Sequence, residues 1–270
     1  MSIGALVRTR GRITAVAATP EPSPGSMRLE QVSKVYGDAA SALHALDRVT
    51  FDVSPGEFVC VLGASGCGKS TLLNLLAGLD RPSSGRITVD GRPSLMFQDA
   101  TLFPWLTAAR NIELPMRLDG LPRTERRDRV TELLELVNLN EFGTKRPHEL
   151  SGGMRQRVAL ARALGQRADV LLMDEPFGAL DAMTRDTLHD VLERIWRDTG
   201  VSVVFVTHNV REAVRLGDRV VLLSSRPGRV IAEFPVAIDR PRRIDSPPVT
   251  ALASTITDQL RAEVSRHGEH

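Results

Sequence analysis

Two segments of the chain carry residues whose types and spacing suit phosphate chemistry. The first fits the pattern G-x-x-x-x-G-K-[ST], with a continuous apolar segment before it and a segment that looks helical after it. Glycines in such a loop let backbone N–H groups turn towards phosphate oxygens, and the N-terminus of the following helix adds positive potential. The loop predicts nucleotide binding, with a lysine beside the β- and γ-phosphates and a hydroxyl on Mg²⁺. Its residues are Gly63, Ala64, Ser65, Gly66, Cys67, Gly68, Lys69, Ser70 and Thr71.

The second segment is the apolar run Val170–Met173, which Asp174 and Glu175 follow directly. Carboxylates at the end of a buried strand cost free energy unless a metal ion or a water molecule uses them. Downstream of a phosphate loop, Asp174 suits the Mg²⁺ shell, and Glu175 suits a base that orients or deprotonates the attacking water. Two solvated acids before Pro176 are the alternative interpretation.

Between these features lies the stretch Leu150-Ser-Gly-Gly-Met-Arg-Gln-Arg. Ser151 can cap a helix, and Gly152 and Gly153 expose backbone amides at its start, which makes a second anion site. Here the chain resembles the ATP-binding cassette (ABC) family, whose signature is Leu-Ser-Gly-Gly-Gln. Met154 replaces the final glutamine. Because the anion ligands are retained, the resemblance still implies a competent ATPase.

The resemblance covers Met27 to Gly228 and implies further site residues. Tyr36 stands where the family's aromatic residue stacks on adenine, and His208 matches the histidine that contacts the γ-phosphate. Gln98 matches the glutamine that joins the Mg²⁺ site to a helical insert, and Asp181 belongs to a loop that crosses the dimer interface. The implied catalytic residues are Glu175, His208, Gln98 and Lys69; the metal ligands are Ser70, Gln98 and Asp174; and Tyr36, Ser151, Gly152, Gly153 and Asp181 join the phosphate loop in nucleotide binding.

The family also implies cofactors and partners. ATP and Mg²⁺ are the cofactors. Two copies of the chain form a head-to-tail dimer, in which Ser151–Gly153 of one copy close the nucleotide site of the other. ATP joins the copies and hydrolysis through Glu175 separates them, which drives integral-membrane permease subunits. The implied location is peripheral, on the cytoplasmic face of the membrane, with an extracytoplasmic solute-binding protein as an indirect partner.

Within the family, several stretches look most like the importers for nitrate, sulfonates and taurine. They are Ser151–Arg157, Phe97–Ala100, Pro104–Trp105 and Asp174–Asp181. The expected function is therefore the ATPase subunit of an importer for a small anionic solute, with aliphatic sulfonates favoured. An exporter ATPase subunit is the alternative. Non-transport ABC ATPases fit less well, because a DNA-repair or chromosome-structure type needs a long coiled coil and a translation type needs two cassettes.

The apolar stretch Thr101–Leu106 is unusual for a segment that follows an active-site residue. In the family this region forms the groove that receives a short cytoplasmic helix of the permease, so the resemblance implies that Trp105 is an anchor of that contact. The alternative is that Phe103 and Trp105 fill the core of the helical insert.

The pattern of apolar residues predicts alternating strands and helices, and hence an α/β fold with a parallel core. With the resemblance, the expected fold is a P-loop ABC cassette with a mainly parallel sheet, an N-terminal antiparallel β part and an inserted helical subdomain. The expected domains are a leader over 1–26, a cassette over 27–240 with its insert at about 99–168, and a helical extension over 241–270. The expected strands are Leu29–Tyr36, Val49–Val53, Phe58–Leu62, Gly85–Asp90, Val170–Met173, Val201–Val206 and Arg219–Leu223; the helices are Leu72–Leu79, Thr124–Val137, Val158–Leu164 and a C-terminal one with the stripe Val249, Leu252, Ile256, Leu260 and Val264.

Composition bounds the remaining possibilities. A chain that is 42% hydrophobic and 25% charged is globular, and a net charge of +2 gives no electrostatic argument for nucleic acid. No apolar run approaches the roughly 18 residues that a membrane span needs. Residues 1–26 are rich in Arg and Pro and lack the apolar core of a signal peptide, which predicts a disordered leader. Two cysteines suit a reducing compartment, and a helix N-terminus beside Lys69 predicts a thiolate at Cys67.

Overall fold

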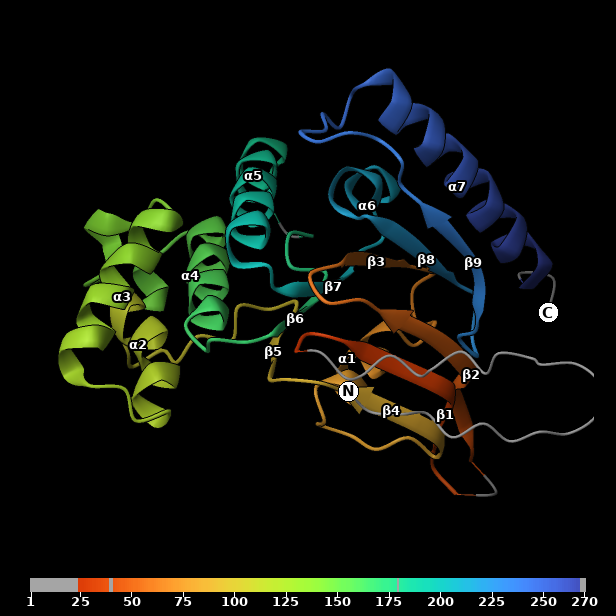
Figure 1. The fold of residues 1–270 in the computed structure, drawn as a ribbon, viewed down its shortest axis with the longest axis horizontal. Coiled ribbons are helices and arrows are strands. Elements are labelled where there is room, and N and C mark those ends of the chain that lie inside the picture. Colours follow the sequence, from red (N-terminus) through yellow and green to blue (C-terminus); the bar gives the residue numbers. More distant parts are fainter. Residues whose placement is uncertain (1–23, 39–40, 179, 268–270) are drawn as a thin grey trace, which may run out of the picture.

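Two sheets organise the computed structural model, which describes residues 24–38, 41–178 and 180–267 (Figure 1). The smaller sheet is antiparallel, with the order β2-β1-β4. The larger sheet has the order β5-β6-β7-β3-β8-β9, and all its neighbours are parallel except β8 and β9. The expected α/β class, with an antiparallel N-terminal part, is therefore confirmed. The strands are β1 (Met27–Tyr36), β2 (Leu43–Val53), β3 (Phe58–Leu62), β4 (Ser84–Val89), β5 (Pro93–Met96), β6 (Val170–Asp174), β7 (Ser202–Val206), β8 (Arg219–Leu223) and β9 (Val230–Pro235).

The central strand β3 is buried on both faces, as its continuous apolar sequence predicts. Phe58, Cys60 and Leu62 point into a core beneath helices α5 (Ala182–Thr199), α6 (Val210–Leu216) and α7 (Pro247–His267). Val59 and Val61 point into a second core on the other face, where α1 (Lys69–Leu76) lies between the two sheets. The loop after β3 therefore starts from a strand that is held from both sides.

The segment from Asp99 to Ala168 forms a helical insert without strands, on the left of Figure 1. It contains α2 (Ala108–Leu118), α3 (Arg123–Leu136), α4 (Gly152–Leu164) and two 3-10 turns, Asn140–Phe142 and Pro147–Glu149. The three helices share their own core, which includes Ile112, Met116 and Leu133. Helix α4 also packs against β5, so the insert is joined to the sheet near the end of that strand.

Several elements differ from the expectations. Helices α2, α5 and α6 and strands β5 and β9 are additional to the expected elements. In the three helices and β9 the apolar residues are interrupted by charged ones, and β5 is only four residues long. The C-terminal stripe forms α7 as expected, with Val249 and Ile256 buried, but Val264 at its far end is 45% exposed.

The last residues of the expected leader contact the segment after β4. Gly25 N donates to Asp90 O and Asp90 N to Ser26 O, at 2.8 and 2.9 Å. The rest of the expected leader lies outside the described residues. No helix within the described part of the chain combines the length and hydropathy that a bilayer span requires.

Candidate nucleotide-binding site

The phosphate loop connects the end of β3 to the start of α1. Gly66 and Gly68 have φ values of +74° and +102°, a backbone conformation that favours glycine. A Cβ on Gly68 would lie 2.7 Å from Ala45 O, so no larger residue fits there. The side chain of Lys69 is 7% exposed, and its Nζ donates to Gly63 O and Ala64 O at 2.9 and 3.0 Å. The loop thus holds a buried ammonium group against its own backbone.

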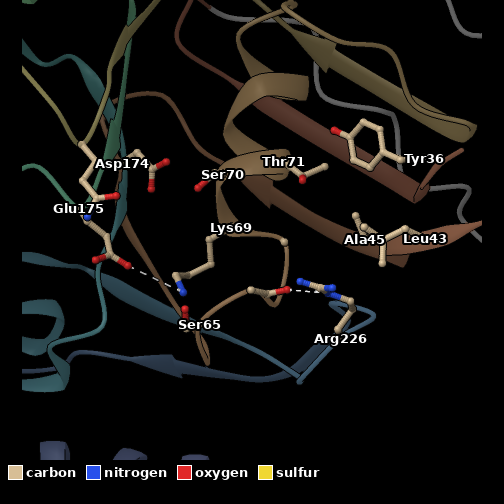
Figure 2. A pocket seen from close by; sticks show the side chains of 13 residues that line it. Tyr36, Leu43, Ala45, Ser65, Lys69, Ser70, Thr71, Asp174, Glu175 and Arg226 are labelled. Atoms are coloured by element: carbon tan, nitrogen blue, oxygen red, sulfur yellow. Dashed lines mark hydrogen bonds and ion pairs between the residues drawn. The ribbon is translucent and has the colours of Figure 1, made fainter. Parts of the chain in front are cut away.

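A cavity of about 340 Å³ opens between this loop and the small sheet (Figure 2). It brings together four of the predicted motifs, which are widely separated in the sequence: the aromatic residue of β1, the phosphate loop, the glutamine after β5 and the acids that end β6. Its lining residues are Tyr36, Leu43, Ala45, Ser65, Gly66, Gly68, Lys69, Ser70, Thr71, Gln98, Asp174, Glu175 and Arg226.

The two acids take different environments. Burial raises the pKa of Asp174 above its usual range, and a hydrogen bond from the Ser70 side chain acts in the opposite direction. Glu175 has a φ of +42°, which is rare for a residue with a side chain and is typical of strained functional positions. Its Oε1 lies 3.9 Å from Lys69 Nζ, and its Oε2 lies 2.8 Å from His208 Nδ1. Glu175 therefore stands between the lysine and the histidine.

The predicted set divides into residues that line the cavity and residues that do not. Ser151 is exposed at the start of α4, where its Oγ accepts a hydrogen bond from Met154 N at 3.2 Å. Asp181 caps α5 in the same way, with Oδ1 accepting from Thr184 N at 3.0 Å. The residues outside the cavity lining are Gly63, Ala64, Cys67, Ser151, Gly152, Gly153, Asp181 and His208, of which His208 still reaches the site through Glu175.

The expected thiolate at Cys67 is wrong. The side chain is 1% exposed and packs in the core around α1. Burial raises the pKa of this thiol, and the nearby Lys69 offsets the shift only in part. The sequence places Cys67 correctly beside a helix N-terminus and a lysine but gives no sign that the side chain points inward.

Three lining residues were missed. Leu43 and Ala45 come from β2, and Arg226 comes from the turn between β8 and β9. Leu43 and Ala45 fit the alternation of a strand, which gives no hint of a ligand. In the sequence, Arg226 is only a basic residue before a proline. Such a pair is common in surface turns and does not indicate a ligand.

The donors near Ser70 fit Mg²⁺. This ion prefers oxygen ligands and takes one or two carboxylates together with phosphate oxygens and waters. Ser70 and Asp174, a hydroxyl and a carboxylate joined by a hydrogen bond, supply part of such a shell, and Gln98 lines the same cavity. Within the described parts of the chain, no group of three or more His, Cys, Asp and Glu could hold a metal ion by itself.

Comparisons with known proteins agree with this geometry. Residues 46–178 match the family model described as ABC transporter. The taurine import ATP-binding protein TauB of Rhizobium johnstonii is 52% identical over 200 residues, which cover 71% of this chain and 76% of that protein. The nitrate import ATP-binding protein NrtD of Synechocystis is 44% identical over 218 residues, which cover 78% and 82%.

Solved structures give the same result for the fold. The ATP-binding cassette MJ0796, a dimer in a post-hydrolysis state bound to ADP and Pi, superposes with a TM-score of 0.72. It is 33% identical and covers 79% of this chain and 100% of its own. The chain therefore belongs to the ABC transporter family and is one of its ATP-hydrolysing cassettes.

Proposed function

We propose that this cassette powers an importer for a small anionic solute, with taurine and other aliphatic sulfonates first and nitrate second. The observation that carries the proposal is the cavity that joins the phosphate loop to Gln98, Asp174 and Glu175, in a chain whose relatives are named as taurine and nitrate import proteins. Those names favour import over export, which the motifs alone leave open.

ATP would lie between Tyr36 and the phosphate loop. The Tyr36 hydroxyl donates to Asp80 at 2.9 Å and Lys34 Nζ lies 4.7 Å from the ring centroid, so the aromatic ring is held in place at the cavity wall for adenine stacking. At the other end, Lys69 exchanges the carbonyls of Gly63 and Ala64 for β- and γ-phosphate oxygens. Burial of this ammonium strengthens its attraction to phosphate.

Ser70, Gln98 and Asp174 would hold Mg²⁺, which when bound neutralises charge on the phosphates. Glu175 orients the attacking water and accepts its proton, since its carboxylate is already held between Lys69 and His208. His208 is exposed and forms a hydrogen bond with Glu175, which supports its proposed role as a contact of the γ-phosphate. The strained backbone of Glu175 fixes this direction before the nucleotide binds.

A second copy would complete each site. Ser151, Gly152, Gly153 and Asp181 lie outside the cavity of their own chain, and the MJ0796 cassette forms a dimer. In a head-to-tail dimer with two-fold symmetry, the amides at the start of α4 face the γ-phosphate held by the other copy. ATP binding then closes the dimer, and hydrolysis opens it.

Permease subunits would receive this motion at the insert. Trp105 is 67% exposed and its ring centroid lies 5.4 Å from that of Phe103, so neither ring fills the insert's core as the alternative interpretation required. Beside them lies a groove of about 340 Å³, whose apolar walls include Met96, Phe97, Phe103, Leu114, Pro115 and Leu118. We propose that a short permease helix docks in this groove, and that the chain therefore works on the cytoplasmic face of the membrane.

Trp105→Ala tests the coupling surface. An aromatic anchor carries on the order of a 30-fold change in affinity, so the variant should weaken permease assembly and solute-stimulated ATPase while sparing the basal ATPase of the isolated chain. Leu79→Ala, which removes an exposed apolar side chain from the loop after α1, is the control. Loss of basal turnover in the Trp105 variant, or intact assembly, would contradict the role.

The function itself is tested by purifying the cassette with its membrane partners and reconstituting the complex in vesicles. With the partner solute-binding protein present, ATP should drive uptake of taurine or another aliphatic sulfonate, and the solute should stimulate hydrolysis. ATP-driven movement in the opposite direction, or no response to sulfonates, taurine and nitrate, would contradict the proposal.

A further inference from the structure

The turn between β8 and β9, residues Ser224–Arg229, is braced by its own hydrogen bonds. Ser224 N donates to Arg229 O at 2.8 Å, and Arg229 N donates to Ser224 Oγ at 2.9 Å. The Ser224 hydroxyl in turn donates to Pro227 O at 2.8 Å. The backbone of the turn is therefore fixed from within, although it lies at the surface.

Gly228 fastens this turn to the nucleotide site. Its N–H donates to Ala45 O at 2.9 Å, and its carbonyl accepts from Asp47 N at 2.9 Å, which joins the turn to β2. A Cβ at position 228 would collide with the carbonyl of Cys67 in the phosphate loop, so only glycine allows this approach. The turn thus has a set position relative to the phosphate loop and to Ala45, a wall of the cavity.

Arg226 projects from this turn to the mouth of the cavity (Figure 2). Its Nε donates to Gly66 O at 3.0 Å, and a Cβ on Gly66 would lie 2.8 Å from its Nη2. The terminal nitrogens have no hydrogen bond to any residue in the described ranges. Arg229 in the same turn is different, because it forms an ion pair with Asp47 at 2.7 Å. Arg226 is therefore a positioned guanidinium whose charge no described carboxylate neutralises within ion-pair distance.

We propose that Arg226 binds a phosphate oxygen of the nucleoside di- or triphosphate in this cavity. The hydrogen bond to Gly66 orients the guanidinium and leaves the terminal N–H groups for an anion, and such charge-assisted hydrogen bonds are strong. Because the side chain is already placed, little conformational entropy is lost on binding. The inference rests on the proposed nucleotide site and adds a phosphate ligand that no part of the signature motifs supplies.

Binding of MgADP, measured by calorimetry on the isolated full-length chain, tests this role. ADP is chosen because its affinity can be read without closure of the dimer. Arg226→Gln should weaken MgADP binding about tenfold, and Arg226→Lys, which keeps the charge but loses the forked geometry, by about threefold. Arg229→Gln, the matched control in the same turn, should stay within about twofold of the wild type.

Competition with adenosine identifies the part of the nucleotide that Arg226 contacts. A phosphate contact predicts equal adenosine affinity in the wild type and in Arg226→Gln. An equal loss for adenosine and ADP would place the guanidinium on the base or ribose and overturn the proposal, and so would an equal loss in the Arg226 and Arg229 variants. Unchanged MgADP affinity, with ATP-driven dimerisation lowered, would assign Arg226 to a second copy of the chain. If the wild type failed to bind MgADP, the proposed nucleotide site would be wrong, and the role of Arg226 would fall with it.

Discussion

Two helices of this protein begin after a glycine-rich segment, and they differ in how their first amides are used. Helix α1 begins after Gly68, which provides no side-chain cap, and the buried Lys69 follows at once. Helix α4 begins after Ser151, whose Oγ already accepts a hydrogen bond from Met154 N. The start of α1 lies in the cavity, whereas the start of α4 is exposed outside it.

The difference indicates two kinds of anion site. A helix start with open amides, a buried cation and walls on several sides can hold phosphate within one chain. The start of α4 is capped, exposed and outside the cavity, although the Arg155 side chain lies beside it, so it contributes only when another surface brings the anion to it. The proposed dimer supplies that surface, and the comparison therefore predicts that one copy binds nucleotide at the α1 site without help, whereas changes at the start of α4 lower turnover and leave nucleotide binding unchanged.

The largest effect on turnover is expected from a change at Glu175, which lines the same cavity as the start of α1. Glu175→Gln should keep ATP affinity but lower turnover by roughly 10²-fold or more, because it removes the proposed general base. Steady-state hydrolysis and equilibrium ATP binding are the measurements. Glu233→Gln, which changes an exposed carboxylate paired with Arg219, serves as the control. Near-normal turnover in the Glu175 variant would remove this residue from the role of base.

A smaller effect is expected at Ser151. Ser151→Ala removes a helix cap, at a cost of about 1 kcal/mol in stability, and should lower turnover about tenfold without changing ATP affinity of the isolated chain. Thr107→Ala is a matched control, because Thr107 caps α2 in the same insert through Arg110 N. Equal turnover in the two variants would show that Ser151 is only a cap.

The smallest effect is expected when the chain is treated with a thiol-alkylating reagent, because Cys67 in the phosphate loop should react slowly. The pKa of this thiol is raised above its ordinary value of 9.0 by burial, so the reactive thiolate is scarce at neutral pH and increases only as the pH rises towards that raised pKa. Alkylation at pH 7, followed by mass spectrometry, should be at least about tenfold slower than that of a free cysteine, with or without MgATP. Fast modification that MgATP prevents would restore the thiolate prediction.

How far the sequence could predict the structure depended on how local each signal was. The strands β3 and β6 and the phosphate loop follow from continuous apolar runs and glycines, and the structure places them as expected. The amphipathic α5 and α6 were missed, since they become helices through packing on the sheet as well as through local pattern. Arg226 was missed because its place depends on the hydrogen bond from Gly228 to Ala45, which is far away in the sequence and whose residue type gives no hint of a ligand.

One measurement tests directly the central claim that the α1 site is complete for binding and the α4 start acts across a dimer. A Cβ on Gly152 would make only an ordinary contact, 3.9 Å from Arg155 Nη2, and Gly152 is not among the glycines with positive φ, so Gly152→Asp should fold normally and place a carboxylate at the start of α4. In the Glu175→Gln background, light scattering with MgATP should give a dimer, and adding Gly152→Asp should give a monomer that still binds ATP with the same affinity. A dimer that persists, or ATP binding that is lost with Gly152→Asp, would contradict the account.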